Sequence, residues 1–170
     1  MLEATTPRTL KESVDLMRIG KAEIEASPDG IDLGGPFLET LSVVGLLDRR
    51  QLADPDSQAF QQGMDLYDQL MHTAMAHQWI VTPGNARADQ LAAGRAYVRV
   101  NLKATELGLG MHPLSQALQE FPEMAALHDE LNATLAPPAG RRVQMLARLG
   151  YGPAVPASPR WPMESRVRSA

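Results

Sequence analysis

The pattern of apolar and polar residues predicts a helix near the start of the chain. Pro7 suits the first position of a helix, where a main-chain N–H group has no partner within the helix. Leu10, Val14 and Met17 follow at spacings of four and three residues, which places them on one helical face. Gly20 is expected to end this helix, and turns rich in glycine and proline come after it.

Two more helices are expected in the next part of the chain. The apolar run 37–47 predicts a short buried helix. Asp54 and Pro55 form a typical helix start, with Asp54 as the N-terminal cap. The amphipathic helix that follows carries four large apolar side chains on one face: Phe60, Met64, Tyr67 and Met71.

The pattern changes at residues 79–82. All four residues, Trp-Ile-Val-Thr, favour strands, and Pro-Gly-Asn follows, so we expect a buried strand that ends in a turn. The stretch 86–110, "ARADQLAAGRAYVRVNLKATELGLG", then contains about 20 residues with no helix breaker except Gly94, which would allow a close backbone approach. Its small and apolar residues lie on more than one side, which predicts a central helix covered on two faces. Arg95 and Arg99 are expected to pair with carboxylates rather than to line a binding site.

The last third of the chain adds a helix, a strand and a tail. Pro122 marks the first turn of the helix, and residues 143–149 alternate as a strand does. The proline-rich segment 153–170 predicts an extended tail on the surface of this chain or of a neighbouring subunit. The whole order predicts an α+β fold with helices packed on a small mixed sheet. Because two or three strands leave open edges, we expect another polypeptide or an upstream half to complete the sheet.

Composition narrows the classes of function. The chain has 170 residues and a net charge of −4, so it has no general attraction for nucleic acid, which binds mainly through its phosphates. It contains no cysteine, which excludes disulfides, thiolate metal ligands and cysteine nucleophiles. No apolar run reaches the roughly 20 residues that cross a bilayer, and the first residues do not form a signal peptide. We therefore expect a cytoplasmic protein with no membrane partner; an exported form would need a signal upstream of Met1.

Familiar catalytic motifs are missing from the sequence. There is no phosphate-binding loop, no His-Glu-x-x-His, and no Gly-x-Gly-x-x-Gly between a strand and a helix. His72 and His77 are five residues apart and point in different directions on a helix, which makes them a poor metal pair. His128 is expected on a solvated helix face. The glycines of "GLG" (108–110) are interpreted as a helix cap. We predict no catalytic side chain and no metal site.

Several segments, taken in order, resemble a known family. They read "AAGRAYVRVNLKATELGLG", "MHPLSQAL", "LARLGYGP" and "SPRWPMES", with "TPRTLKESVDLMRIGKAEIEASPDGIDLGGP" upstream. Together they resemble the second half of the nitroreductase superfamily of FMN-dependent oxidoreductases, most of all its Acg-like branch, whose members are often labelled as twin-arginine-signal proteins. The resemblance runs from about Thr6 to Glu164. It implies that residues 1–152 are the C-terminal half of a nitroreductase-like domain and that residues 153–170 are its extended tail.

The resemblance implies where a flavin would bind. In this superfamily the segment after the long helix lies beside the flavin ring, and its main-chain N–H and C=O groups contact the polar edge of the ring. The matching residues here are Pro113, Leu114, Ser115 and Gln116, for which a simple turn is the alternative interpretation. A basic residue in the last segment holds the FMN phosphate. Arg160 is the matching position, with a solvated surface arginine as the alternative.

The implied chemistry is hydride transfer from NAD(P)H to FMN and on to a small nitro- or quinone-type acceptor. The flavin performs this chemistry, which agrees with a sequence that lacks a catalytic side chain. The basic "R.S.R.F"-type segment and the "S.N.QPW"-type helix with which superfamily members begin are not in this sequence. We therefore expect a homodimer or a missing N-terminal half. The alternatives are a non-catalytic protein that sequesters flavin or only dimerises, and an inactive fragment of a longer enzyme.

Overall fold

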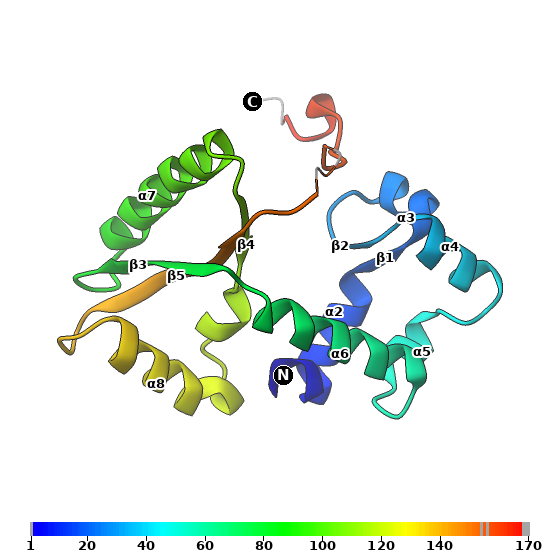
Figure 1. The fold of residues 1–170 in the computed structure, drawn as a ribbon, viewed down its shortest axis with the longest axis horizontal. Helices are drawn as coiled ribbons and strands as arrows, with labels where there is room; N and C mark the ends of the chain where they lie inside the picture. Colours follow the sequence, from blue (N-terminus) through cyan, green and yellow to red (C-terminus); the bar gives the residue numbers. More distant parts are fainter. Residues whose placement is uncertain (1, 154, 156, 168–170) are drawn as a thin grey trace. The chain divides into compact units, whose positions relative to one another are not determined.

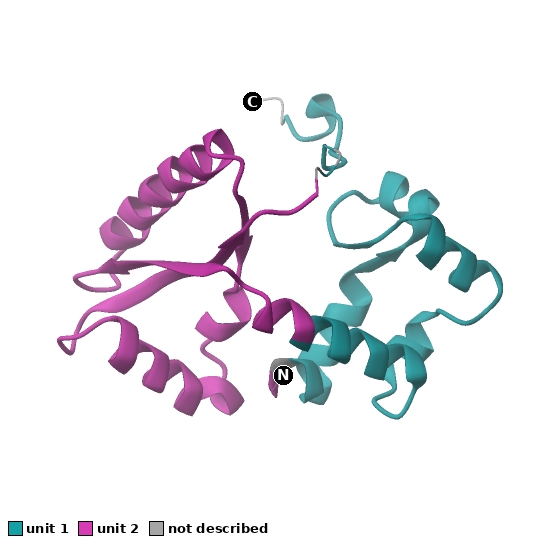
Figure 2. Cartoon of the chain, viewed as in Figure 1, with its two compact units in different colours: residues 1, 3–68, 155–170 teal, residues 2, 69–154 magenta. Residues whose placement is uncertain are grey.

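The chain forms two compact units, each with a small sheet of its own. The computed structural model describes residues 2–153, 155 and 157–167. Unit 1 contains residues 3–68 and the tail from residue 155, and unit 2 contains Leu2 and residues 69–154 (Figure 2). The predicted α+β class is confirmed. The single mixed sheet is not found, because one sheet is wholly parallel and the other wholly antiparallel.

The first part of the chain is mainly helical. Its elements are α1 (Leu2–Thr5), α2 (Pro7–Leu16), β1 (Met17–Ile19), α3 (Gly20–Ala26), β2 (Ile31–Leu33), α4 (Pro36–Val43), α5 (Arg49–Ala53) and α6 (Gln58–His72). The strands β1 and β2 are parallel and only three residues long. Residues 58–68 of α6 belong to unit 1, and residues 69–72 belong to unit 2 (Figures 1 and 2).

The core of unit 1 lies where α2 meets α6. Leu10, Val14 and Phe60 form a buried cluster, with Met17, Leu52 and Met64 packed against it. The predicted apolar face of α2 is therefore correct, and Pro7 is its first residue. The predicted helix end at Gly20 is wrong. The chain leaves α2 after Leu16, runs through β1, and starts α3 at Gly20, whose φ of 78° suits a glycine.

Two other predictions in unit 1 need correction. The expected buried helix over 37–47 is the exposed helix α4, in which Phe37 is 73% and Val43 87% exposed. The N-terminal cap of α6 is Ser57 rather than Asp54, because the Ser57 hydroxyl accepts a hydrogen bond from the Phe60 N–H group at 3.1 Å. Asp54 instead accepts a hydrogen bond from the Asp56 N–H group in the preceding turn.

Unit 2 is built on a three-stranded antiparallel sheet with the strand order β3-β5-β4. Figure 1 shows α7 and α8 on opposite sides of these strands. The strands predicted at 79–82 and 143–149 are confirmed as parts of β3 and β5, but the expected burial of residues 79–82 is wrong for Trp79, which is 45% exposed. The elements are β3 (Ala76–Thr82), α7 (Arg87–Glu106), β4 (Gly110–Pro113), the 3₁₀ helices η1 (Ser115–Leu118) and η2 (Pro122–Met124), α8 (Ala125–Leu135) and β5 (Arg142–Gly150).

A bulge interrupts the pairing of β3 with β5. Ile80 pairs with Met145 and Val81 pairs with Val143, so Gln144 is an extra residue on β5. The Gln144 amide nitrogen donates hydrogen bonds to the Thr82 hydroxyl at 2.9 Å, and to oxygens of the turn that leads into α7. The bulge therefore ties β5 to the start of α7.

The long helix α7 is one-sided rather than central. Only Ala93 and Ala104 are buried in it, and a Cβ atom added at Gly94 would meet nothing within 4 Å. The predictions of two covered faces and of a close backbone approach at Gly94 are therefore wrong.

Arg95 and Arg99 are exposed, and neither forms an ion pair with any residue that the structure describes. The prediction that His128 of α8 is solvated is also wrong. His128 is buried, and its ring Nε2 lies 3.1 Å from the Asn132 amide nitrogen.

The described part of the tail, 155 and 157–167, contains η3 (Met163–Ser165) and is otherwise irregular. It belongs to unit 1, where Arg166 lies over the Trp161 ring, 4.4 Å from its centroid, and 3.6 Å from the Asp29 carboxylate. Residues 154, 156 and 168–170 of the predicted tail lie outside the described residues. The predicted boundary between residues 152 and 153 stays a prediction.

Candidate functional site

The glycine cap predicted after the long helix is confirmed, and it starts the segment for which a flavin contact is predicted. Gly108 has a φ of 69°, and its N–H group donates to the Thr105 carbonyl at 3.0 Å. The Leu109 N–H group donates to the Ala104 carbonyl at 2.8 Å. These two bonds satisfy the last carbonyls of α7 and turn the chain directly into β4.

The predicted cofactor residues lie at the junction of β4 and η1. Pro113 pairs with Ala147 of β5, and the buried Leu114 donates its N–H group to the Leu146 carbonyl at 2.8 Å. The Leu114 N–H group is therefore occupied by a hydrogen bond to β5 and is not free to bind a ligand. Ser115 and Gln116 begin η1, and their N–H groups have no hydrogen-bond partner among the described residues. These two groups are the free main-chain donors of the predicted segment.

Arg160 is exposed and lies in unit 1, whereas Pro113, Leu114, Ser115 and Gln116 lie in unit 2. Its side chain makes no ion pair or hydrogen bond within the described residues. The neighbouring residues Ser158 and Pro159 line a small hollow of about 160 Å³ with Arg18 and Asp32.

Trp161, next to Arg160, packs against Asp29 and Arg166. Its indole N–H group and the Ser27 hydroxyl lower the pKa of the Asp29 carboxyl. The indole N–H group is buried and lies near this carboxylate without a hydrogen bond of normal geometry. These contacts attach the part of the tail next to Arg160 to the turn that contains Asp29.

A larger hollow of about 410 Å³ lies in unit 2, where β4 and β5 meet the end of α6. We call it the His112 hollow. It exists partly because Gly110 and Gly150, which pair across β4 and β5, and Gly152 have no side chains to fill it. Its remaining lining residues are Leu70, Thr73, Ala74, Met75, Met111, His112, Arg148, Leu149, Tyr151 and Pro153.

His112 and Arg148 form the polar centre of this hollow. They pair across β4 and β5, and Arg148 donates from Nε to His112 Nδ1 at 2.9 Å. Arg148 also donates from Nη1 to the Leu70 carbonyl. His112 is an exposed residue, yet partial desolvation of its ring, and then the charge of Arg148, lower the pKa of His112 below its ordinary 6.5. The ring is therefore neutral at pH 7 and carries its proton on Nε2.

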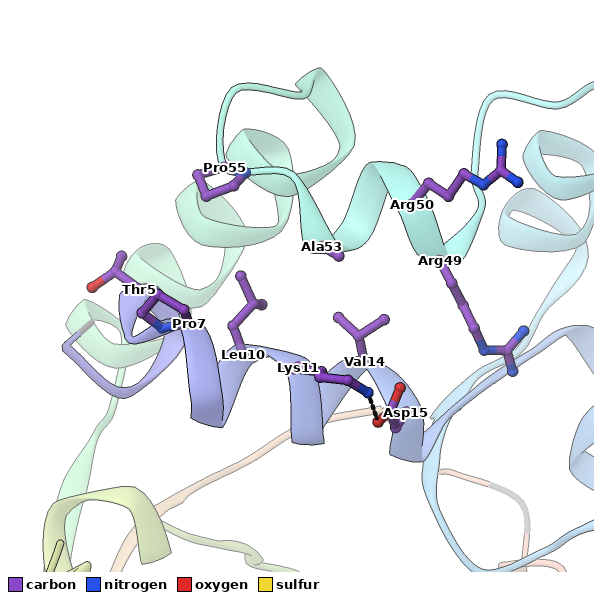
Figure 3. A pocket seen from close by; sticks show the side chains of 10 residues that line it. All are labelled: Thr5, Pro7, Leu10, Lys11, Val14, Asp15, Arg49, Arg50, Ala53 and Pro55. Carbon is purple, nitrogen blue, oxygen red and sulfur yellow. Dashed lines mark hydrogen bonds and ion pairs between the residues drawn. The ribbon is translucent and has the colours of Figure 1, made fainter.

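A second hollow of about 430 Å³ lies in unit 1 between α2 and α5 (Figure 3). Leu10 and Val14 project into it from α2, and an ion pair of Lys11 with Asp15 lies at its side. Because Leu10 and Val14 also belong to the core cluster, this hollow is an open side of the core of unit 1. It brings no cluster of free polar groups together.

Unit 1 has one strongly shifted carboxyl group. Arg49 donates from Nη1 and Nη2 to the two oxygens of Glu23 at 3.0 and 2.5 Å, and the Ile19 N–H group donates to Glu23 at 2.9 Å. These bonds lower the pKa of Glu23 to about 2. Arg49 also donates to the Met17 carbonyl at 2.9 Å. The pair joins α3, α5 and β1, which indicates a structural role.

The pair of His112 and Arg148 was not predicted from the sequence. His112 lies within the motif "GLGMHPLSQAL", and Arg148 faces away from the more apolar side of a predicted strand. The two residues are 36 positions apart. Only the register of β4 against β5 brings them together, and no sequence pattern gave that register.

The described residues contain no group of three or more histidines and carboxylates arranged to hold a metal ion. None of the helices in this part of the chain has the length and apolar character that crossing a membrane requires. Comparisons with protein-family models, with curated proteins and with solved structures found no match. The resemblance to the nitroreductase superfamily therefore stays a prediction.

Proposed function

We propose that the chain is an FMN-dependent NAD(P)H oxidoreductase of nitroreductase type, or part of one, that works with a second subunit or an N-terminal half. The observation that carries the proposal is the pair of free N–H groups at Ser115 and Gln116, within the segment that resembles the flavin site. Main-chain donors near the flavin ring tune its potential, and the flavin itself carries the hydride. NAD(P)H supplies the hydride, and a nitro- or quinone-type compound accepts it.

The free guanidinium group of Arg160 is consistent with a role in holding the FMN phosphate. A guanidinium group stays charged and offers paired donors, which suit a phosphate. Riboflavin has the same ring without the phosphate, so the two ligands test the predicted ring contact and the predicted phosphate contact separately.

The first test is a titration of the purified full chain with FMN and with riboflavin, followed by flavin fluorescence. Replacement of Arg160 by Gln is expected to weaken FMN binding about tenfold, the loss of roughly one charged hydrogen bond, and to leave riboflavin binding unchanged. Ser115→Pro removes one main-chain donor and is expected to weaken both ligands. The matched control is Arg99→Gln, an exposed arginine of α7.

Oxidation of NADH and NADPH in the presence of a nitroarene or a quinone then tests turnover. Turnover that depends on added FMN supports the proposal. A chain that shows no saturable flavin binding would contradict it.

The alternative function, a protein that only dimerises or sequesters flavin, is favoured by the outer face of α7. Leu91, Val98 and Leu102 form a stripe at helical spacing and are 51%, 55% and 67% exposed. Apolar stripes of this kind are characteristic of interfaces. A second copy of the chain is the partner we propose for this stripe. Flavin binding without NAD(P)H oxidation, in a stable dimer, would select this alternative.

A further inference from the structure

The His112 hollow contains Arg148, a cation that pairs with no carboxylate among the residues that the structure describes. Arg148 is half-buried, and the groups it contacts, His112 Nδ1 and the Leu70 carbonyl, are both uncharged. No acidic residue lines the hollow. A partly buried charge without a counter-ion is unfavourable, and it gains from an anion that enters its site.

The free hydrogen-bonding groups of the pair are all donors. Arg148 uses Nε and one N–H of Nη1, so the other N–H of Nη1 and both N–H groups of Nη2 remain. Because His112 accepts at Nδ1, the neutral ring has its proton on Nε2 and can only donate there. A ligand must therefore bring acceptors.

Apolar side chains provide the walls around this donor pair. Leu70, Met75, Met111 and Leu149 line the hollow, and Tyr151 adds an aromatic ring. Its volume of about 410 Å³ falls within the range of small-molecule sites, roughly 300–1,000 Å³. Such walls suit the apolar body of a small molecule better than an inorganic ion.

We propose that the His112 hollow binds a small organic anion, a carboxylate or phosphate monoester on an apolar or aromatic body, with Arg148 and His112 contacting its acidic group. The site uses none of the residues assigned to the flavin. It stands or falls independently of the proposed oxidoreductase function.

Benzoate and phenyl phosphate are the two probes, and uncharged benzamide is the matched neutral body. Each is titrated into the full chain and followed by NMR, using the Arg148 Nε–H signal, the His112 ring signals and the main-chain amides of Gly110, Gly150 and Gly152. We expect saturable shifts of these signals with at least one of the two anions. We expect at least tenfold weaker binding of benzamide. The better of the two anions identifies the acidic group.

Two variants test the role of the charge. Arg148→Gln is expected to weaken binding of the anion at least tenfold, and Arg148→Lys to retain part of it, because lysine keeps the charge and loses the planar fork. Arg99→Gln, on the outer side of α7, is expected to bind as the unchanged chain does.

The proposal is overturned if benzamide binds as well as the anions, or if the shifted signals lie outside the hollow. It is also overturned if Arg148→Gln and Arg99→Gln bind alike. The signal map of the unchanged chain is decisive even if Arg148→Gln does not fold. Loss of flavin binding in the Arg160 variant leaves this result unaffected, which separates the two proposals.

Discussion

At the scale of single residues, two arginine pairs show how the fold brings together side chains that the sequence does not connect. Glu23 with Arg49 and His112 with Arg148 each join positions far apart in the chain. In the first pair both members are charged, and the contact supports the fold. In the second pair the histidine is neutral, so the charge of Arg148 remains available.

The Glu23 pair makes the stability of unit 1 depend on pH. The pKa of Glu23 falls from 4.5 to about 2 on folding, so its contribution is complete above pH 4.5 and is lost as the pH falls through about 2. The side chain is 40% exposed, so solvent screening limits that contribution to about 1 kcal/mol. Glu23→Gln should therefore lower the unfolding free energy by about 1 kcal/mol at pH 7, and urea titrations should show the difference vanish near pH 2.

Glu25→Gln is the matched control for this prediction. Glu25 forms only an exposed pair with Lys21 at 3.5 Å, so its replacement should change the unfolding free energy by less than about 0.5 kcal/mol. If both replacements change the unfolding free energy equally at pH 7, the pair of Glu23 and Arg49 stabilises the fold no more than an exposed ion pair does.

His112 should titrate below pH 6.5 in the folded chain. Partial burial of the ring is the larger cause of its lowered pKa, and the charge of Arg148 is the smaller one. Arg148→Gln should therefore raise the midpoint only part of the way back to 6.5, as followed by the ring signals in NMR. Because the unfolded chain takes up this proton first, unit 2 should lose stability as the pH falls below 6.5. A midpoint at or above 6.5 in the unchanged chain would contradict the neutral ring.

At the scale of elements, the sequence predicted long and regular segments best. The strands at 79–82 and 143–149 and the long helix within 86–110 were found because their patterns extend over several residues. The strands β1 and β2 are three residues long, too short for an alternation to be visible. Burial of α4 and α7 was overestimated because an apolar run shows which side chains favour burial, and not whether another element covers them.

Gly94 within α7 and Gly108, which caps the end of this helix, should respond in opposite ways to alanine. Gly94 lies in the helix interior with free space around it, so Gly94→Ala should stabilise the chain by about 0.5–1 kcal/mol. Gly108 has a φ of 69°, which strains any other residue, so Gly108→Ala should destabilise it by about 1 kcal/mol. Thermal unfolding of both variants measures the two effects. A loss of stability at Gly94 would mean that the outer face of α7 is covered.

At the scale of the whole molecule, few large side chains are buried. Ala147 is completely buried, but no large side chain in the described part of the chain is. Many large apolar residues are exposed in both units, including Val44 and Leu46 in unit 1 and Leu102 and Leu107 in unit 2. The sequence suggested an incomplete sheet, and this distribution gives a physical reason to look for a partner.

The partner proposed for α7 can be tested directly. Val98→Glu combined with Leu102→Glu places two charges in the exposed stripe and should disrupt a dimer without unfolding the chain, because neither side chain is part of the core. Sedimentation velocity compares the association of the variant and of the unchanged chain. Ala92→Glu with Arg99→Glu, two other exposed positions of α7, is the control. Identical sedimentation of all three chains would exclude this stripe as the contact.

The bulge at Gln144 marks the position in β5 where related chains can most easily lose one residue. Because Gln144 is unmatched on β3, deleting it would let β5 close up against its neighbour as a regular ladder, whereas a deletion at Ala147 would slide two pairings at once. Related chains should therefore differ by one residue at this position more readily than anywhere else in β5. The deletion would also remove the hydrogen bonds from the Gln144 side-chain amide to Thr82 and Asn85. Chains without this residue therefore need another donor to fix the turn before α7.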